Sequence, residues 1–239
     1  MNAFIKAVLQ ANKEIYECLH VKGLEEEDYH SFCIGAGGDR SSGIDLKAEK
    51  IFITHLSAFG TIYSEESGII ENTDSSIDII IDPIDGSDNL LSHLPYYGTS
   101  VAYKEKGKCT QAIIVNLANG DVFIKNEHSF LKGKLYDSQF TNVMPNAISK
   151  VGIFERSYCS QILLPKLHSL GLKYRSPGAF ALSLAYAHEV SFVMYEGVMR
   201  SYDVEAGLFM CEDLYCYYKE DIFLVSKDKE IFDKISKLI

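Results

Sequence analysis

The feature that most constrains this chain is the stretch DIIIDPIDGSDNLLSHLP, residues 78–95. Three carboxylates, Asp82, Asp85 and Asp88, fall within seven positions, directly after an isoleucine-rich segment typical of a buried strand. Like charges a few ångströms apart repel one another, and neither a hairpin nor a hydrophobic core requires them. The stretch therefore predicts a strand that ends in a turn where something positively charged binds.

Two simpler explanations account poorly for this turn. A calcium loop of the EF-hand type that began at Asp82 would place Ile84, Ser87 and His93 where the loop requires an oxygen ligand, a glycine and a glutamate. A plain surface turn is favoured by Asp, Pro and Gly, but it needs only one of the aspartates. The remaining interpretation is a metal site at the end of a strand.

The residues around the aspartates fit such a site. Pro83 stiffens the turn, Gly86 allows a left-handed backbone, and Ser87 can open a short helix whose N–H groups face the ligand of the aspartates. Carboxylates are suited to Mg²⁺ and the N–H groups at a helix start are suited to phosphate. The two preferences together predict a site for a metal ion and a phosphate group.

The segment DPIDGSDN resembles the signature of the inositol monophosphatase family, which are Mg²⁺-dependent and typically lithium-sensitive phosphatases. Upstream, SSGIDLKAE supplies Asp45, and SEES supplies Glu65 and Glu66. Downstream, SPGAFALSLAYAHEVSFVMYEG and YDVEAG, which contains Asp203, resemble two further family motifs. These five motifs occur in the family's order over residues 38–210, which is most of the chain.

The resemblance implies a role for each matching residue. Two Mg²⁺ ions, with a third and looser one, are expected on Glu65, Asp82, the backbone carbonyl of Ile84, Asp85 and Asp203, and Mn²⁺ is expected to substitute. The expected catalytic residues, which place and activate the attacking water, are Asp45, Glu65 and Ser87. The N–H groups of Gly86 and Ser87 are expected to hold the phosphate.

The substrate rim is the less constrained part of the site. The expected contacts from the second half of the chain are Arg175, Gly178, Ala179, Glu196, Arg200 and Asp203. Glu196 matches a family position that contacts sugar hydroxyls, so a polyol or sugar is favoured over a nucleotide, and both inositol 1-phosphate and fructose 1,6-bisphosphate are predicted substrates. The arginines, above all Arg175, are candidates for a second phosphate. A 3′-phosphoadenosine 5′-phosphate phosphatase and a metal-binding regulatory protein without turnover remain open alternatives.

Several positions depart from the family pattern. Leu90 and Tyr202 replace a usual phenylalanine and tryptophan, while Ser87 keeps the hydroxyl of the common threonine. Glu205 replaces a small residue beside Asp203, and we expect it to face solvent and not to add a ligand. The region 128–140 is shorter than usual, so the sequence leaves open the shape of the pocket rim and with it the substrate.

The alternation of expected elements divides the chain into two halves. Residues 1–135 predict an α+β half, with helices over 1–20 and 44–60, a strand over 76–82 and an antiparallel meander within 98–127. Residues 136–239 alternate between strands and helices and predict an α/β half. The family resemblance implies that the two halves form a layered α/β/α/β/α sandwich.

Composition excludes some function classes. The net charge is −10, and no basic cluster exceeds two residues, which argues against a nucleic-acid surface. No apolar run approaches the roughly 20 residues of a membrane span, and the first 20 residues have the periodicity of an amphipathic helix and not of a signal peptide. The six cysteines are scattered, as in free thiols of the cytoplasm. The resemblance also implies a homodimer.

Overall fold

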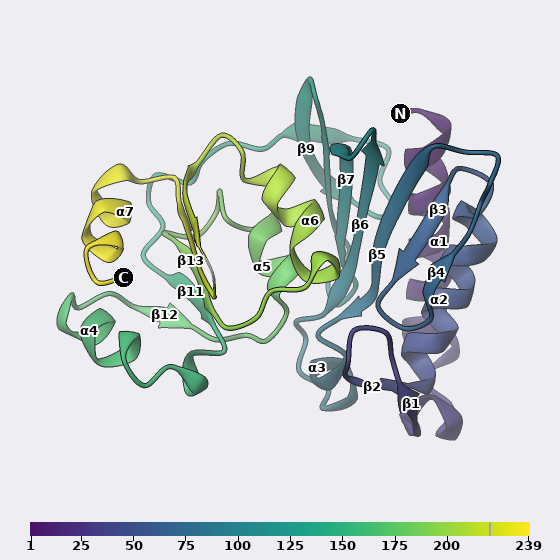
Figure 1. Ribbon diagram of the computed structural model, residues 1–239, viewed down its shortest axis with the longest axis horizontal. Helices are drawn as coiled ribbons and strands as arrows, with labels where there is room; N and C mark the ends of the chain where they lie inside the picture. The colour runs from purple at the N-terminus through teal and green to yellow at the C-terminus, as the bar shows by residue number, and fades with distance from the viewer. Residues whose placement is uncertain (220) are drawn as a thin grey trace.

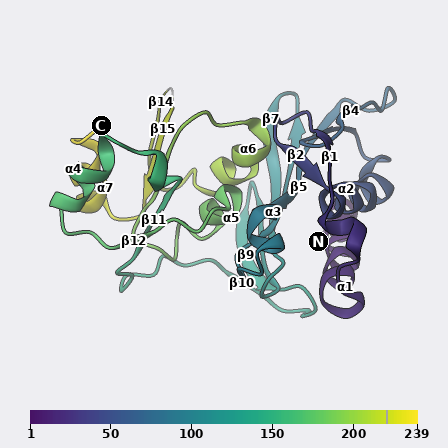
Figure 2. The ribbon, with the colours of Figure 1, turned by 90° about the horizontal axis from the view of Figure 1, so that it is seen from below.

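The computed structural model describes residues 1–219 and 221–239. The chain forms five layers, and the views in Figures 1 and 2 show them as helices, sheet, helices, sheet and helices from one end of the molecule to the other. The predicted α/β/α/β/α sandwich is confirmed. The two sheets contain eight and five strands.

The first outer layer consists of α1 (Ala3–Glu17) and α2 (Gly43–Leu56), which cover one face of the eight-stranded sheet. Asn2 caps α1 through its side chain, which accepts the N–H of Ile5. Ser42 caps α2 as part of a capping box. The apolar face of each helix is buried against the sheet, as the helical periodicity predicts.

The eight-stranded sheet has the order β10-β9-β8-β7-β6-β5-β3-β4. Its strands are β3 (Thr61–Ser64), β4 (Gly68–Ile70), β5 (Ile77–Asp85), β6 (Gly98–Glu105), β7 (Lys108–Asn116), β8 (Asp121–Asn126), β9 (Ser129–Lys134) and β10 (Phe140–Asn142). Every neighbouring pair is antiparallel except β3 with β5. The predicted meander therefore extends beyond residue 127, because β9 pairs with β8 and β10 pairs with β9.

The middle layer consists of α5 (Phe180–Ala185) and α6 (Ser201–Met210), which lie between the two sheets. On one side Ala181, Leu182 and Phe209 pack against the eight-stranded sheet. On the other side Leu184 and Val204 pack against the second sheet. Helices that are covered on both sides carry apolar residues all round, which is why α5 shows little amphipathic pattern.

The second sheet has the order β12-β11-β13-β15-β14. Its strands are β11 (Gly152–Glu155), β12 (Tyr174–Arg175), β13 (Val193–Glu196), β14 (Tyr215–Lys219) and β15 (Ile222–Ser226). The helices α4 (Leu163–Ser169) and α7 (Lys229–Ser236) form the last layer. Pro165 lies in the first turn of α4, where a missing N–H costs no helical hydrogen bond.

Short elements connect these layers. They are η1 (Cys18–Lys22), η2 (Glu26–Tyr29), the hairpin of β1 (Ser31–Ile34) and β2 (Arg40–Ser42), the helix α3 (Ser87–Leu91), and η3 (Ser157–Cys159). Residues 35–39, which include three glycines, form the tip of this hairpin, and the short helix expected after Gly86 is α3. In the described ranges, no helix is long and apolar enough to cross a membrane. The predicted division at residue 135 stays a prediction.

Candidate metal centre

The centre begins where β5 departs from regular pairing. The register with β6 is regular from Ile77 to Asp82 and then shifts before Asp85, which pairs with Gly98. Residues three apart in a regular strand face opposite sides of a sheet, whereas a bulge re-aims the chain. Both aspartates therefore line the same cavity.

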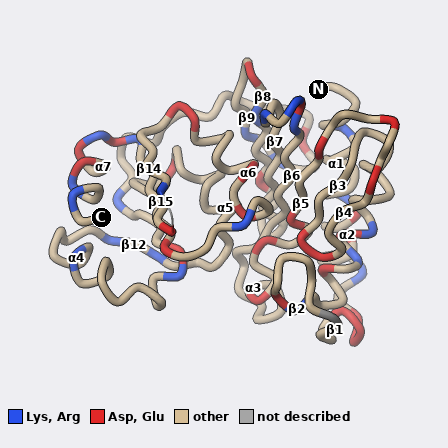
Figure 3. The backbone as a smooth tube through the Cα atoms, in the orientation of Figure 1, with Lys and Arg blue, Asp and Glu red and all other residues tan. Residues whose placement is uncertain are grey.

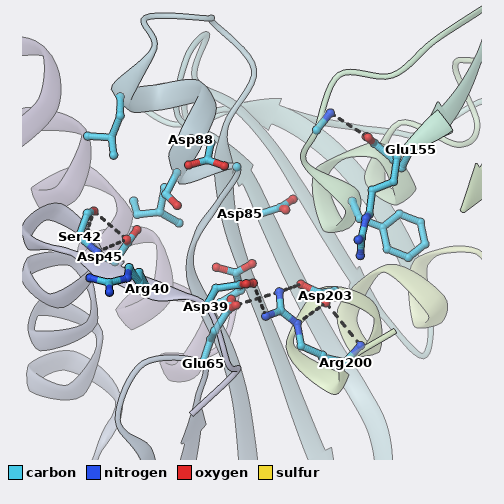
Figure 4. A pocket seen from close by; sticks show the side chains of 18 of the residues that line it. Asp39, Arg40, Ser42, Asp45, Glu65, Asp85, Asp88, Glu155, Arg200 and Asp203 are labelled. Atoms are coloured by element: carbon cyan, nitrogen blue, oxygen red, sulfur yellow. Dashed lines mark hydrogen bonds and ion pairs between the residues drawn. The ribbon is translucent and has the colours of Figure 1, made fainter. Parts of the chain in front are cut away.

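Two carboxylates from other elements join Asp82 at this point. Glu65 follows β3, and Asp203 lies in the first turn of α6. One oxygen from each of Glu65, Asp82 and Asp203 can be chosen so that all three lie within 4.8 Å of one another. Figure 4 shows Glu65 and Asp203 near one another with Asp85 above them, and Figure 3 shows acidic residues gathered near α3 and β2.

Burial makes this group of carboxylates electrostatically costly. Asp82 is only 2% exposed, and desolvation, followed by the charge of Glu65, raises its pKa well above the ordinary value. Desolvation also raises the pKa of Asp85, although that carboxylate accepts the N–H of Leu182 at 2.7 Å. Burial raises the pKa of Glu65 to about 7, with Arg200 acting in the opposite direction.

Two carboxylate oxygens near this centre have no hydrogen-bond partner in the described part of the chain, and this bears on whether a metal ion fits there. Among the described residues, Oδ1 of Asp82 and Oδ1 of Asp45 are buried and accept no hydrogen bond. Unpartnered carboxylate oxygens that converge with like charges are the donor set that hard divalent cations prefer. The residues present therefore fit Mg²⁺ or Mn²⁺.

Asp45 is held at the start of α2 by its own helix cap. Its Oδ2 accepts the N–H of Ser42 at 2.8 Å and the hydroxyl of Ser42 at 2.7 Å. These bonds leave the buried Oδ1 without a donor, and desolvation raises the pKa of the carboxyl. The capping box therefore fixes the direction of one carboxylate and leaves one oxygen available.

Gly86 and α3 form the opposite wall. Gly86 has a φ of +85°, and a Cβ there would lie 2.9 Å from the Cβ of Ala179, so the position requires glycine for both conformation and space. Asn89 donates to the carbonyls of Tyr96 and Pro177, each at 2.7 Å. The two Asn89 bonds tie the turn after β5 to the segment before α5.

Glu155 is a site residue that the sequence reasoning missed. It ends β11, is 1% exposed, and accepts hydrogen bonds from the N–H of Gly178 at 2.8 Å, the N–H of Ala179 at 3.4 Å and the hydroxyl of Ser183 at 2.5 Å. Desolvation raises its pKa in spite of these donors. The sequence signal that could have revealed Glu155 is an acidic residue at the end of an otherwise apolar strand.

These residues surround one cavity of about 610 Å³. Most of the predicted site residues line this cavity. They are Asp45, Glu65, Asp82, Ile84, Asp85, Gly86, Ser87, Gly178, Arg200 and Asp203. Ala179 is buried behind its neighbour Gly178, and Glu196 does not line the cavity, although its Oε2 is buried without a partner.

The arginines are arranged differently from the expectation. Arg175 does not line the cavity, because it lies on the edge strand β12, where its exposed side chain donates to the carbonyl of Tyr174 at 2.8 Å. Arg40 and Arg156 line the cavity instead. Arg156 donates to the hydroxyl of Tyr195 at 3.1 Å, and within the described part of the chain no carboxylate pairs with it.

Glu205 lies away from the carboxylate group. Its Oε1 is 2.5 Å from Nζ of Lys104 on β6, and both side chains are partly exposed. The ion pair engages Glu205, which does not line the cavity. This side chain therefore adds no ligand to the centre, in keeping with the expectation from the sequence, although it pairs with a lysine where solvent exposure was predicted.

Comparison with known proteins finds a matching family and several similar sequences. The model of the inositol monophosphatase family matches residues 6–214. A fructose-1,6-bisphosphatase of Pyrococcus furiosus is 29% identical over 189 residues, which cover 75% of this chain and 70% of that protein. The Nus factor SuhB of Escherichia coli K12 is 26% identical over 220 residues, covering 87% and 79%.

Solved structures have the same fold. The crystal structure of the extragenic suppressor protein SuhB from Bartonella henselae superimposes with a TM-score of 0.78 at 22% identity. The superposition covers 100% of this chain and 97% of that one. The likeness extends over all five layers.

Proposed function

Because this chain belongs to the inositol monophosphatase family, we propose that it is a Mg²⁺-dependent phosphatase of small sugar or polyol phosphates. The observation that carries the proposal is the convergence of Glu65, Asp82 and Asp203 on one wall of a cavity that also holds the Gly86 turn. Two to three ions are expected, on these residues with Asp85 and the carbonyl of Ile84.

The metal ions and the side chains of the protein have separate roles in the proposed reaction. Bound at these carboxylates, Mg²⁺ would stabilise the charge on the phosphoryl oxygens and lower the pKa of a water molecule. Asp45 accepts the proton of the attacking water at Oδ1, the oxygen that Ser42 leaves free. Ser87 orients that water, and the N–H groups of Gly86 and Ser87 hold the phosphate.

The wall beyond the carboxylates favours a substrate with a second negative group. Arg40 and Arg156 line the cavity, and in the described residues neither forms an ion pair. A bisphosphate needs such a cation, since its second phosphate cannot share the metal ions. We therefore propose fructose 1,6-bisphosphate and inositol 1-phosphate as substrates, with Arg40 and Arg156 in place of Arg175 at the second phosphate. We also propose a cytoplasmic homodimer.

A phosphate-release assay tests the function. The full chain is incubated with fructose 1,6-bisphosphate, inositol 1-phosphate or 3′-phosphoadenosine 5′-phosphate, in Mg²⁺, in Mn²⁺ or in excess EDTA. We expect release from the first two substrates with either metal and none with EDTA. Turnover in EDTA would contradict the metal mechanism, and activity on the nucleotide alone would contradict the substrate class. Absence of all release from a metal-binding protein would favour a regulatory role, which the similarity to a Nus factor brings into the comparison.

A further inference from the structure

The guanidinium of Arg200 lies among the carboxylates and pairs with three of them, Asp39, Glu65 and Asp203. Nε donates to Oδ2 of Asp203 at 2.9 Å, and Nη2 donates to Oδ1 of Asp203 at 3.1 Å and lies 2.9 Å from Oε1 of Glu65. Nη1 donates to Oδ2 of Asp39 at 2.7 Å and to the carbonyl of Gly37 at 3.0 Å. Figure 4 shows Arg200 between Asp39, Glu65 and Asp203. The guanidinium thus donates four hydrogen bonds and forms ion pairs with three carboxylates.

Two of these partners belong to the three carboxylates that converge for a metal ion. Both oxygens of Asp203 and one oxygen of Glu65 face the guanidinium. A divalent ion on the same oxygens would lie within a few ångströms of the arginine charge, and like charges at that distance repel strongly in a buried site. The arginine and a divalent ion would therefore compete for this pair of carboxylates.

The glycine-rich tip of the β1–β2 hairpin takes part in the contact. The N–H of Gly37 donates to the carbonyl of Glu65 at 2.7 Å. A Cβ on Gly37 would lie 2.6 Å from Cγ of Glu65 and 3.1 Å from Nη1 of Arg200. The absence of a side chain at Gly37 therefore lets the hairpin tip close over the arginine and Glu65.

We propose that Arg200 is a built-in counter-ion that competes with the divalent metal for Glu65 and Asp203. In the metal-free protein the guanidinium offsets the repulsion between the carboxylates, and it leaves them when the metal binds. The hairpin tip, held through Asp39 and Gly37, is released in the same step. This inference rests on the metal site of the proposed function, and it gives Arg200 a role different from the substrate contact expected from the sequence.

Competition predicts opposite effects of one substitution on two measurements. Arg200→Met removes the charge and keeps an unbranched side chain, so the metal-free protein loses its internal cation and melts at a lower temperature. The metal, in contrast, no longer has to displace a cation. We expect the Kd for Mn²⁺, obtained from the free-ion signal in electron paramagnetic resonance, to fall at least about 10-fold. Isothermal titration with Mg²⁺ provides the second readout.

Arg156→Met is the matched control, since Arg156 lines the same cavity without a carboxylate partner in the described residues. We expect its Kd for Mn²⁺ to stay within about two-fold of the wild type. If Arg200→Met does not fold, Arg200→Lys, which keeps the charge but loses the two-pronged contact, should still lower the Kd about three-fold. An unchanged or raised Kd in a folded Arg200 variant would overturn the competition. A wild type that binds Mn²⁺ but releases no phosphate would overturn the proposed function alone.

Discussion

At the residue scale, the partners of individual carboxylate oxygens separate structural from chemical roles. Asp85 is anchored through Oδ2, which accepts the N–H of Leu182 from α5. Asp82 and Asp45 each keep one buried oxygen without a partner among the described residues. The unpartnered oxygens are the ones that can bind a cation or accept a proton from water.

Asp85→Asn tests the residue scale. The amide oxygen can still accept the N–H of Leu182, so the fold is expected to persist. Removal of one negative charge relieves repulsion with Asp203, so the metal-free protein should melt at the same or a higher temperature. Loss of a metal ligand should lower kcat by about 10³-fold or more. Asp78→Asn, at the other end of β5, is the control, and near-normal kcat of Asp85→Asn in saturating Mg²⁺ would contradict the assignment.

At the element scale, the cavity depends on a turn that belongs to neither sheet. The segment from Pro177 to Ala179 is held by Asn89 from α3 on one side and by Glu155 from β11 on the other. The same turn contacts Gly86, where the phosphate is expected. We therefore propose that Glu155 is a positioning residue, which would act on the substrate through the backbone of this turn.

Glu155→Gln tests this position. The three donors around Glu155 match a carboxylate, and a glutamine would bring its own amide N–H toward one of them. We expect the turn to shift and KM for inositol 1-phosphate to rise about 10-fold, while the Kd for Mn²⁺ stays within about two-fold. Glu189→Gln is the control, because it alters an ion pair with Lys132 and neither residue lines the cavity. If the Kd for Mn²⁺ rose by the same factor as KM, Glu155 would instead belong to the metal centre.

At the scale of the whole molecule, the metal centre joins two layers. Glu65 and Asp82 come from the eight-stranded sheet, and Asp203 comes from α6 between the sheets. A cation at this place would offset part of the net charge of −10 and would tie the sheet to the middle helices. The global stability should therefore depend on both metal and pH.

The direction of the pH dependence follows from the raised pKa values. Burial raises the pKa of Glu65 and of Glu66 from 4.5 to about 7, so the folded protein binds more protons than the unfolded chain between these values. The free energy of unfolding of the metal-free protein must then fall as pH rises from about 4.5 to about 7. For a fully buried group, a pKa shift of this size changes the free energy of unfolding by about 3 kcal/mol, and solvent screening makes the change smaller here.

Thermal melts between pH 5 and pH 7.5 measure this effect. With EDTA, we expect the Tm to fall by several degrees across the range. With saturating Mg²⁺ the fall should be smaller, since the ion replaces the protons that the carboxylates lose. Asp121 and Asp213 have lowered pKa values, so their contribution is lost only as the solution becomes more acidic than this range. A Tm that rises with pH in EDTA would contradict the prediction.

The sequence by itself determined the family, the five-layer fold and the residues of the acidic turn. Asp82, Asp85, Gly86 and Ser87 lie within six positions, so local chain geometry brings them together whatever the rest of the molecule does. Helices such as α1 follow from periodic burial, which is written into the order of apolar residues. The strands β9 and β10 were missed because the pairing of β9 with β8, and of β10 with β9, compensates for weak local preference.

Only the tertiary structure decided how the rest of the cavity is built. Arg200 and Asp39 are 161 positions apart, and Glu155 and Ser183 are 28 apart, so no local spacing predicts their contacts. Arg175 lies close in sequence to the turn at Gly178, yet its place on an edge strand turns it toward solvent, whereas Arg156 lines the cavity. The physical reason is that the packing of two sheets against α5 and α6 sets which strand ends meet. That packing depends on burial summed over the whole chain and not on any single motif.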